Sequence, residues 1–262
     1  MAAIALLLSC APTVVTTVGA DAAPPALDAA LARPGPHPTA ITTGRLRSAY
    51  GCTLRFELHL AAGEAGRATV VLAPGFLRDL GTMRGWAAHF ASHGVPTAVV
   101  SFCNSTPFAG RHDRNAADLR AVADTLRPPG GPVLYAGFSA GGLAALLAAA
   151  EDVGASAFLG LDAVDSGGLA ADASGLGAPA LFLAAEPSSC NAQGNLLPVA
   201  ATIAAARVVR VPNATHCHFE DPYAPLCERL CGRVEPASAA EAIRNAIRGL
   251  ATAWVLEHAA HR

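Results

Sequence analysis

The chain has 262 residues, of which 52% are hydrophobic and 15% are charged, and its formal net charge is −2. This composition supplies ample apolar surface for a buried core, which excludes intrinsic disorder over most of the length. Without a basic excess, nucleic acid is not an expected partner. Because a sheet flanked by helices often folds as one unit at this length, we expect a single folded domain.

The amino-terminal region reads as an export segment followed by a linker. Residues 1–20 carry no charge and form an apolar run that ends in small residues, which predicts a signal peptide although the usual basic start is missing. Cys10 lies in a segment similar to a lipoprotein attachment box, which leaves a lipid-anchored protein as the alternative. Residues 21–40 are rich in Ala and Pro and predict a flexible linker. We therefore expect a secreted or cell-envelope protein.

From Ile41 onward, short apolar runs alternate with helical patterns. This alternation is typical of an α/β fold, a mostly parallel sheet with helices on both faces. We expect strands near 52–60, 68–73, 97–102, 132–136, 156–161, 179–184 and 206–211, and helices near 82–93, 114–127, 140–151, 197–205 and 237–258. The first of these strands alternates apolar and polar residues, as an antiparallel strand near a sheet edge does. No segment after residue 20 has 18 uninterrupted apolar residues, so no transmembrane segment is expected.

A Gly-x-Ser-x-Gly pattern at residues 137–141 stands between an apolar run and a segment of strong helix formers. A strand, a tight turn and a helix are the context in which this pattern exposes a nucleophilic serine. Ser139 must adopt a strained backbone conformation there, and Gly137 and Gly141 allow the strand and the helix to approach closely. Ser139 is therefore the predicted nucleophile. The alternative is a Gly-rich helix start in another kind of α/β protein.

Two backbone amides are candidates for stabilising a negative oxygen. The first is the N–H of Ala140, which directly follows the predicted nucleophile at the start of a helix. The second should come from the loop after an earlier strand, and the apolar run at 70–73 leads into Pro74-Gly75-Phe76. Gly75 lets the backbone turn so that the Phe76 N–H points at the developing charge. A plain Pro-Gly turn is the alternative interpretation.

The predicted base is one of two histidines near the end of the chain. His216 and His218 follow the strand expected over 206–211, which gives the chain order serine, acid, histidine. His216 is the preferred base, and the ring of His218 points elsewhere in the loop in this interpretation. His112 precedes the helix expected from residue 114 and is predicted to belong to its capping region.

Three carboxylates compete for the role of the acid. Asp162 ends the strand over 156–161, at the carboxyl edge where catalytic groups gather in such sheets. Glu186 follows the next strand, but Pro187 restricts it to extended conformations. Asp165 precedes a Gly-rich segment and is expected to cap or solvate the loop. Asp162 is preferred, and the other two stay open.

The cysteines predict disulfides. Apart from Cys10 there are six, an even number consistent with three bridges in an oxidising compartment; buried free thiols are the alternative. If the strand at 52–60 lies beside the strand at 97–102, Cys52 is close to Cys103, and we expect this pair to be bonded. Any full pairing of the others joins Cys190 to Cys217, Cys227 or Cys231. No CxxC pair is present, and we expect no metal and no cofactor.

With these residues placed, the chain resembles the branch of the α/β-hydrolases that contains chlorophyllases, bacterial cutinases and related polyester hydrolases. The resemblance covers about residues 45–235 and rests on the segments 73–76, 137–142, 160–165 and 215–219. Residues 161–165 look like the Leu-Asp-Pro-Val-Asp run of chlorophyllases, where the first Asp is the triad acid, and residues 215–216 are similar to their Gly-His segment. Ala163 and Thr215 depart from that pattern, which weakens the case for chlorophyll as the substrate.

This resemblance implies a metal-independent serine hydrolase with the α/β-hydrolase fold, Asp162 as acid and His216 as base. Residues 41–262 form the expected catalytic domain, and the segment between 162 and 179 is too short for a helical lid domain. The predicted reaction is hydrolysis of small or polymeric esters. A serine peptidase or amidase on the same scaffold is one alternative, because both share this chemistry. An inactive homologue that acts as a secreted binding protein is the other.

Overall fold

A computed structural model describes residues 29–63, 69–127, 129, 131–223, 225–231 and 236–259. The signal peptide expected over 1–20, with Cys10, lies outside the described residues. No helix in the described ranges combines the length and the apolar character that crossing a membrane requires.

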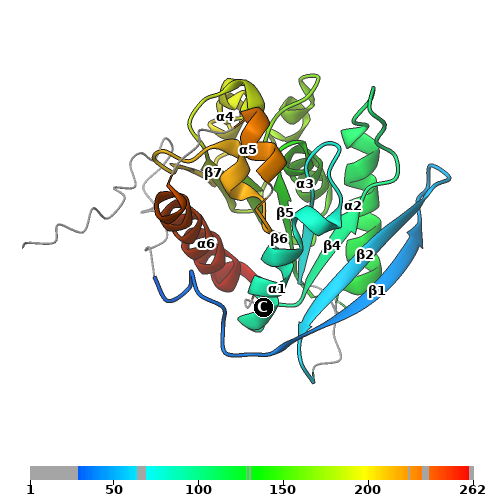
Figure 1. The fold of residues 1–262 in the computed structure, drawn as a ribbon. Coiled ribbons are helices and arrows are strands. Elements are labelled where there is room, and N and C mark those ends of the chain that lie inside the picture. Colours follow the sequence, from blue (N-terminus) through cyan, green and yellow to red (C-terminus); the bar gives the residue numbers. More distant parts are fainter. Residues whose placement is uncertain are drawn as a thin grey trace, which may run out of the picture.

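Eight described strands form one sheet in the order β1-β2-β4-β3-β5-β6-β7-β8 (Figure 1). Their bounds are β1 (Thr39–Arg47), β2 (Thr53–Ala61), β3 (Val70–Ala73), β4 (Thr97–Ser101), β5 (Val133–Phe138), β6 (Ala155–Leu161), β7 (Ala180–Ala184) and β8 (Ala206–Arg210). β2 runs antiparallel to β1 and β4, and the other neighbours are parallel. Helices cover both faces of the central strands, which therefore consist of continuous apolar runs. The predicted mostly parallel sheet is confirmed.

The helices lie in two layers, one on each face of the sheet. Their bounds are α1 (Arg84–Ser92), α2 (His112–Leu126), α3 (Ala140–Glu151), α4 (Leu197–Ala200), α5 (Pro225–Cys231) and α6 (Ala237–Ala259). α2 and α3 share an apolar cluster with one face, whereas α1 and α6 share a second cluster with the other. α3 is buried at nearly every position, because it lies against both the sheet and α2. The helix expected over 197–205 is shorter than predicted and ends at Ala200.

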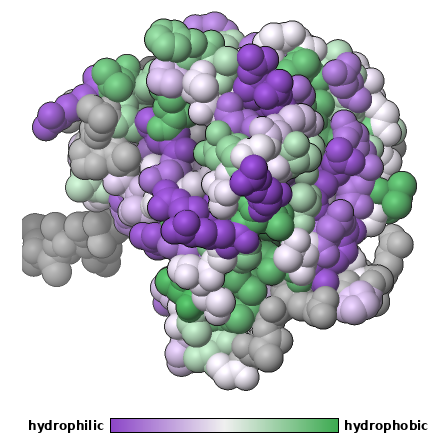
Figure 2. All heavy atoms as spheres, turned by 90° about the vertical axis from the view of Figure 1, so that its right-hand side faces the viewer, coloured by the Kyte–Doolittle hydropathy of each residue, from purple (hydrophilic) through white to green (hydrophobic). Residues whose placement is uncertain are grey.

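The strand at the edge of the sheet was not predicted from the sequence. β2 is antiparallel and lies near the edge, as expected, but β1 pairs with it along its whole length and forms the edge itself. Most side chains of β1 are exposed, so its sequence has no apolar alternation that would reveal a strand. Arg45 and Arg47 place charge on this strand, as edge strands commonly do. The side of the molecule next to β1 and β2 carries many hydrophilic side chains (Figure 2).

The linker predicted over 21–40 is wrong in its second part. The described residues from 29 onward lie against α1: the Gly35 N–H donates to Ser92 Oγ over 2.8 Å, and the His37 N–H donates to the Ser92 carbonyl over 3.1 Å. Ala32 is buried. Backbone hydrogen bonds and one small apolar side chain hold this segment, and neither produces a periodic pattern in the sequence. The folded domain therefore begins before Ile41.

Candidate active site

Ser139 lies in the sharp turn between β5 and α3. Its backbone has φ 55° and ψ −131°, a conformation that a non-glycine residue adopts only when its surroundings enforce it. A Cβ at Gly137 would lie 2.4 Å from the Gly141 carbonyl oxygen, and one at Gly141 would lie 2.1 Å from the Pro74 carbonyl oxygen. The two glycines therefore permit the close approach of strand, helix and neighbouring loop on which the turn depends. The Ser139 side chain lies half-buried at the carboxyl edge of the sheet.

The two predicted oxyanion donors lie on segments that flank Ser139. Ala140 is the first residue of α3, and Phe76 lies in the loop after β3. A Cβ at Gly75 would lie 3.2 Å from Ser139 Cβ, which shows how closely this loop passes the serine. Neither the Ala140 nor the Phe76 backbone N–H has a hydrogen-bond acceptor among the described residues. Both donors are therefore free to bind an external oxygen.

His216 begins a short 3-10 helix, His216–Phe219, in the segment that follows β8. Its Nε2 lies 3.0 Å from Ser139 Oγ, and its ring lies against Phe138 with the ring centroids 4.6 Å apart. His218 points elsewhere, because its Nδ1 accepts the Thr215 N–H over 2.9 Å. Burial lowers the pKa of His218, because it disfavours the charged form of the ring. His216 is thus the histidine that the structure brings to the serine.

Asp162 directly follows β6 and contacts the other nitrogen of His216. The distance from Asp162 Oδ2 to His216 Nδ1 is 2.6 Å, and the Ala185 N–H donates to Asp162 Oδ1 over 2.9 Å. Asp162 is 3% exposed, and its backbone has φ 45°. Ser139, His216 and Asp162 thereby form one continuous hydrogen-bonded chain. A carboxylate in this position holds the imidazole in the tautomer whose Nε2 can accept a proton.

The two alternative acids lie away from the imidazole. Glu186 is half-exposed, and its carboxylate lies 3.9 Å from Arg210 Nη1. Asp165 Oδ1 accepts the Ala170 N–H over 3.1 Å, which is the loop-capping role expected for it. His112 is the first residue of α2 and lies edge-on to Phe76, with ring centroids 6.3 Å apart. Burial lowers the pKa of His112.

Asn191 also lies at this site and was not predicted from the sequence. Asn191 is fully buried, and its side-chain amide lies within hydrogen-bonding distance of both carboxylate oxygens of Asp162. It is part of a capping box with Ser188 at the start of a 3-10 helix, Ser189–Gly194. The Ser-x-x-Asn spacing can reveal such a helix start, but it gives no sign of the contact with Asp162.

Three disulfides brace the described chain. Cys52 is bonded to Cys103, the pair expected from strand order, and links the start of β2 to the segment after β4. The other bonds are Cys190–Cys231 and Cys217–Cys227. Among the described residues, Cys217, Cys227 and Cys231 have the spacing of a metal site, with their sulfurs within 4.8 Å of one another. All three sulfurs are in disulfides, so they lack the thiolate that a metal requires.

Two grooves of the described chain lie apart from this hydrogen-bonded chain. One, of about 600 Å³, lies between the β1–β2 hairpin and the start of α1 and is lined by polar residues such as Arg45, Glu57 and Arg84. The other, of about 430 Å³, lies between the segment at 34–39 and α1. Neither groove includes Ser139, His216 or Asp162 in its lining.

Comparison with solved structures identifies the fold. A ferulic acid esterase from Streptomyces cinnamoneus superposes with a TM-score of 0.60 at 19% sequence identity, over 84% of this chain and 91% of that one. A putative dienelactone hydrolase from Klebsiella pneumoniae subsp. pneumoniae superposes with a TM-score of 0.53 at 17% identity, over 67% and 87% of the two chains. No protein-family model and no curated protein matches the sequence. The chain has the α/β-hydrolase fold.

Proposed function

We propose that the protein is a secreted serine hydrolase that cleaves carboxylic esters, with Ser139 as nucleophile, His216 as general base and Asp162 as the acid of the triad. The observation that carries this proposal is the unbroken hydrogen-bonded chain from Ser139 Oγ through His216 to Asp162, with contacts of 3.0 and 2.6 Å. A serine hydroxyl is a weak nucleophile until a neighbouring base accepts its proton. His216 is the group in position to do so.

The reaction would proceed in two stages. Ser139 Oγ attacks the ester carbonyl carbon while its proton passes to His216 Nε2, and the Ala140 and Phe76 N–H groups bind the oxyanion. The tetrahedral intermediate collapses as the C–O bond of the alcohol breaks, and the protonated His216 gives its proton to the leaving alcohol oxygen. Water, deprotonated by His216, then attacks the acyl-enzyme and releases the carboxylic acid. Asp162 stabilises the imidazolium in both stages.

Preference for esters has separate support. Both solved structures named above belong to proteins described as hydrolases, and one is described as an esterase. Phe76 and Leu77 are exposed on the loop that passes Ser139, so they provide apolar surface for a substrate beside the nucleophile. The resemblance to chlorophyllases and cutinases points the same way, and membership of that branch is part of the proposal. Three disulfides fit an extracellular environment, which supports secretion.

Labelling with a fluorophosphonate probe tests the nucleophile, because such probes react with activated serines. We expect the purified protein to be labelled and Ser139→Ala to be inert, while Ser166→Ala, which changes an exposed serine, is labelled normally. Absence of labelling in the folded wild-type protein would contradict catalysis and favour a binding role. A panel of p-nitrophenyl esters and the corresponding anilides then separates an esterase from an amidase. Faster turnover of the anilides would overturn the ester assignment.

A further inference from the structure

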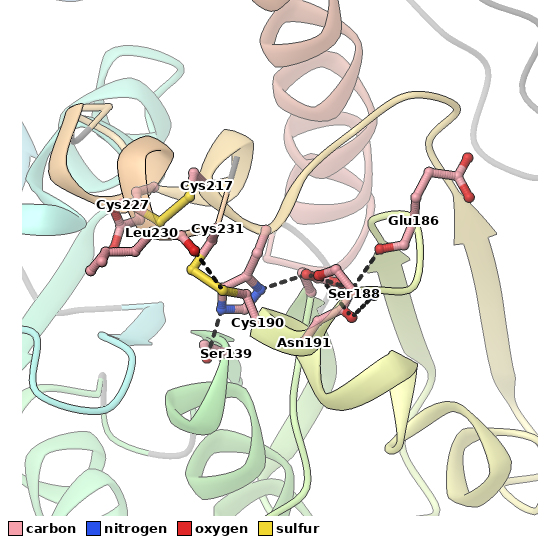
Figure 3. The surroundings of a disulfide bond; sticks show 12 residues. Ser139, Glu186, Ser188, Cys190, Asn191, Cys217, Cys227, Leu230 and Cys231 are labelled. Atoms are coloured by element: carbon pink, nitrogen blue, oxygen red, sulfur yellow. Dashed lines mark hydrogen bonds and ion pairs between the residues drawn. A yellow bond between two sulfur atoms is a disulfide. The ribbon is translucent and has the colours of Figure 1, made fainter. Parts of the chain in front are cut away.

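Asn191 joins the two oxygens of the Asp162 carboxylate. Its Nδ2 lies 3.3 Å from Asp162 Oδ1 and 3.2 Å from Oδ2, and it also donates to the Glu186 carbonyl over 2.9 Å. Asn191 and Asp162 are 0% and 3% exposed. Ser139 lies at Nε2 of His216, whereas Asp162, with Asn191 beyond it, lies at Nδ1; Ser139 and Asn191 are labelled in Figure 3. The amide therefore contacts the carboxylate from behind, as seen from the nucleophile.

The orientation of this amide is fixed by its other end. The Ser188 N–H donates to Asn191 Oδ1 over 2.8 Å, and the Ser188 hydroxyl lies 3.4 Å from the same oxygen. An amide has donors on its nitrogen and acceptors on its oxygen. Because Ser188 requires the oxygen, the nitrogen must face Asp162. A flipped amide would place its oxygen against the carboxylate and lose both sets of bonds.

The backbone around Asn191 is held by a disulfide. Cys190 is bonded to Cys231 of α5, and Cys227, one helical turn earlier in α5, is bonded to Cys217. Cys190 precedes Asn191, and Cys217 follows His216. The sulfurs of Cys217, Cys227 and Cys231 lie within 4.8 Å of one another, so the two bridges are side by side (Figure 3). Through α5, the segment that carries Asn191 and the segment that carries His216 are covalently tied to one another.

We propose that Asn191 is a positioning residue that holds the Asp162 carboxylate in the orientation in which Oδ2 meets His216 Nδ1. This inference rests on the proposed function of the triad. Asp162 Oδ1 is held by the Ala185 N–H, and the amide spans both oxygens, so the carboxylate cannot rotate about its side-chain bond without losing hydrogen bonds. Partners behind a functional group commonly set its orientation and its charge in this way. Asn191 makes no contact with Ser139, so it acts through Asp162.

Other charged groups around His216 are engaged elsewhere, so a change at Asn191 reports on the Asp162–His216 pair. Glu186 faces Arg210, and His218 accepts a hydrogen bond from Thr215. Glu220 accepts a hydrogen bond from Arg78. Among the described residues, Asp162 is the charged side chain that contacts the imidazole directly.

The test replaces Asn191 by Asp, which keeps an oxygen for the Ser188 N–H but places a second carboxyl group against Asp162. Because two buried carboxyl groups this close share a proton, Asp162 then presents less negative charge to the imidazole. We expect kcat to fall by about 10-fold or more with little change in KM, and the acid limb of the kcat/KM profile to move to lower pH, since the protonated imidazole is stabilised less. A purely structural defect would lower activity without moving this limb.

The matched control is Asn195→Asp, four residues along the chain. Asn195 also organises a loop through its amide, with contacts of 3.0 and 2.9 Å to the Asp165 backbone, and it is expected to keep the wild-type profile. If Asn191→Asp behaves like this control while the wild type hydrolyses esters, the positioning role is wrong and the proposed function survives. A wild-type protein that is inert toward esters and the fluorophosphonate probe contradicts the proposed function instead.

If Asn191→Asp does not fold, NMR spectroscopy of the wild-type protein tests the positioning role of Asn191 instead. In wild-type protein labelled with ¹⁵N-asparagine, the side-chain amide resonances of Asn191 should shift with pH and follow the same midpoint as the acid limb. The hydrogen bonds to Asp162 would transmit the change of charge on His216. Resonances that stay constant through that range would overturn the inference.

Discussion

The guanidinium of Arg78 and the carboxylate of Glu220 join the two loops on which the proposed chemistry depends, with Nε and Oε1 2.6 Å apart. Arg78 lies two residues after Phe76, and Glu220 directly follows the short helix that starts at His216. The Glu220 side chain is fully buried, whereas that of Arg78 is 29% exposed. The Trp86 indole N–H donates to the Phe219 carbonyl over 2.9 Å in the same region. The Arg78–Glu220 contact therefore ties the loop that carries Phe76 to the segment that carries His216.

We predict that Arg78→Met destabilises the protein more than Glu220→Gln does. Removing Arg78 leaves a buried carboxylate without its counter-charge, which typically costs about 3 kcal/mol in the free energy of unfolding. Removing the charge of Glu220 leaves a guanidinium that can reach solvent, so the cost is smaller. Urea denaturation of the three proteins measures both differences. An equal or larger loss for Glu220→Gln would show that the ion pair does not contribute in this way.

The assignment of the acid gives a second prediction. Asp162→Asn should lower kcat by about 10⁴-fold without unfolding the protein, because the imidazole would then adopt the wrong tautomer. Glu186→Gln and Asp165→Asn should have mild effects, since these side chains face Arg210 and the Ala170 N–H. Circular dichroism verifies the fold of each variant, and ester turnover ranks them. A severe loss in Glu186→Gln with near-normal turnover in Asp162→Asn would reverse the assignment.

A third prediction concerns Gly141, which allows the start of α3 to approach the loop that carries Phe76. In Gly141→Ala, the new Cβ would lie 2.1 Å from the Pro74 carbonyl oxygen, so the loop carrying Phe76 must move. We expect kcat/KM to fall by about 100-fold through the displaced oxyanion donor, and the unfolding free energy to fall by about 1–3 kcal/mol. Gly177→Ala is the control, because its Cβ would meet no atom within 4 Å. Equal kcat/KM values for the two variants would show that the contact between α3 and the Pro74 carbonyl does not position the Phe76 N–H.

The turn between β5 and α3 that carries Ser139 could be predicted from the sequence because its features are local. A strand, two glycines at fixed spacing and a helix former all lie within a few residues of Ser139. The end of β6, which Asp162 directly follows, could be located for the same reason, since a buried parallel strand is a continuous apolar run in the sequence. In both cases the steric requirements act between residues close in the chain, so they appear as a local sequence pattern.

Contacts between distant segments leave no such pattern. Asn191 is 29 residues from Asp162, and its amide could face any acceptor as far as the sequence indicates. β1 was missed because its side chains are mostly exposed, so pairing with β2 left no apolar alternation. The segment from residue 29 to 38 bonds through its own backbone groups to Ser92, His89 and His93 at α1, so these contacts do not select the side chains of the segment itself.

A fourth prediction compares two disulfides. Replacing both Cys190 and Cys231 by Ser should lower the unfolding free energy by about 2–5 kcal/mol and also lower kcat, because Asn191 adjoins the bridge. Replacing Cys52 and Cys103 should cost stability in the same range and leave kcat near the wild-type value, since that bond links the start of β2 to the segment after β4. Denaturation curves and kcat below the unfolding transition separate the two effects. Equal kcat in both double variants would show that the Cys190–Cys231 disulfide does not influence the geometry at Asp162 and His216.

The last prediction concerns stability in acid. Burial lowers the pKa of His89, on α1, from its ordinary value of 6.5 to about 4. His89 is therefore neutral in the folded protein at pH 5, where its Nε2 lies 2.9 Å from the Leu31 carbonyl oxygen, whereas the unfolded chain binds a proton. Between pH 6.5 and about 4 the unfolded state binds more protons, so stability decreases as the pH falls through this window. Burial also lowers the pKa of His59, His112 and His218, which acts in the same direction.

His89→Gln isolates this contribution, because Gln can still donate to the Leu31 carbonyl but does not titrate. The loss of unfolding free energy between pH 6.5 and 4 should be smaller in this variant than in the wild type, by at most about 3 kcal/mol. His37→Gln is the control, since His37 is exposed on the same amino-terminal segment. Urea denaturation at several pH values gives the slopes. If His89→Gln and the wild type lose stability in parallel, His89 takes up its proton in the folded protein as readily as in the unfolded chain, and burial does not hold it neutral.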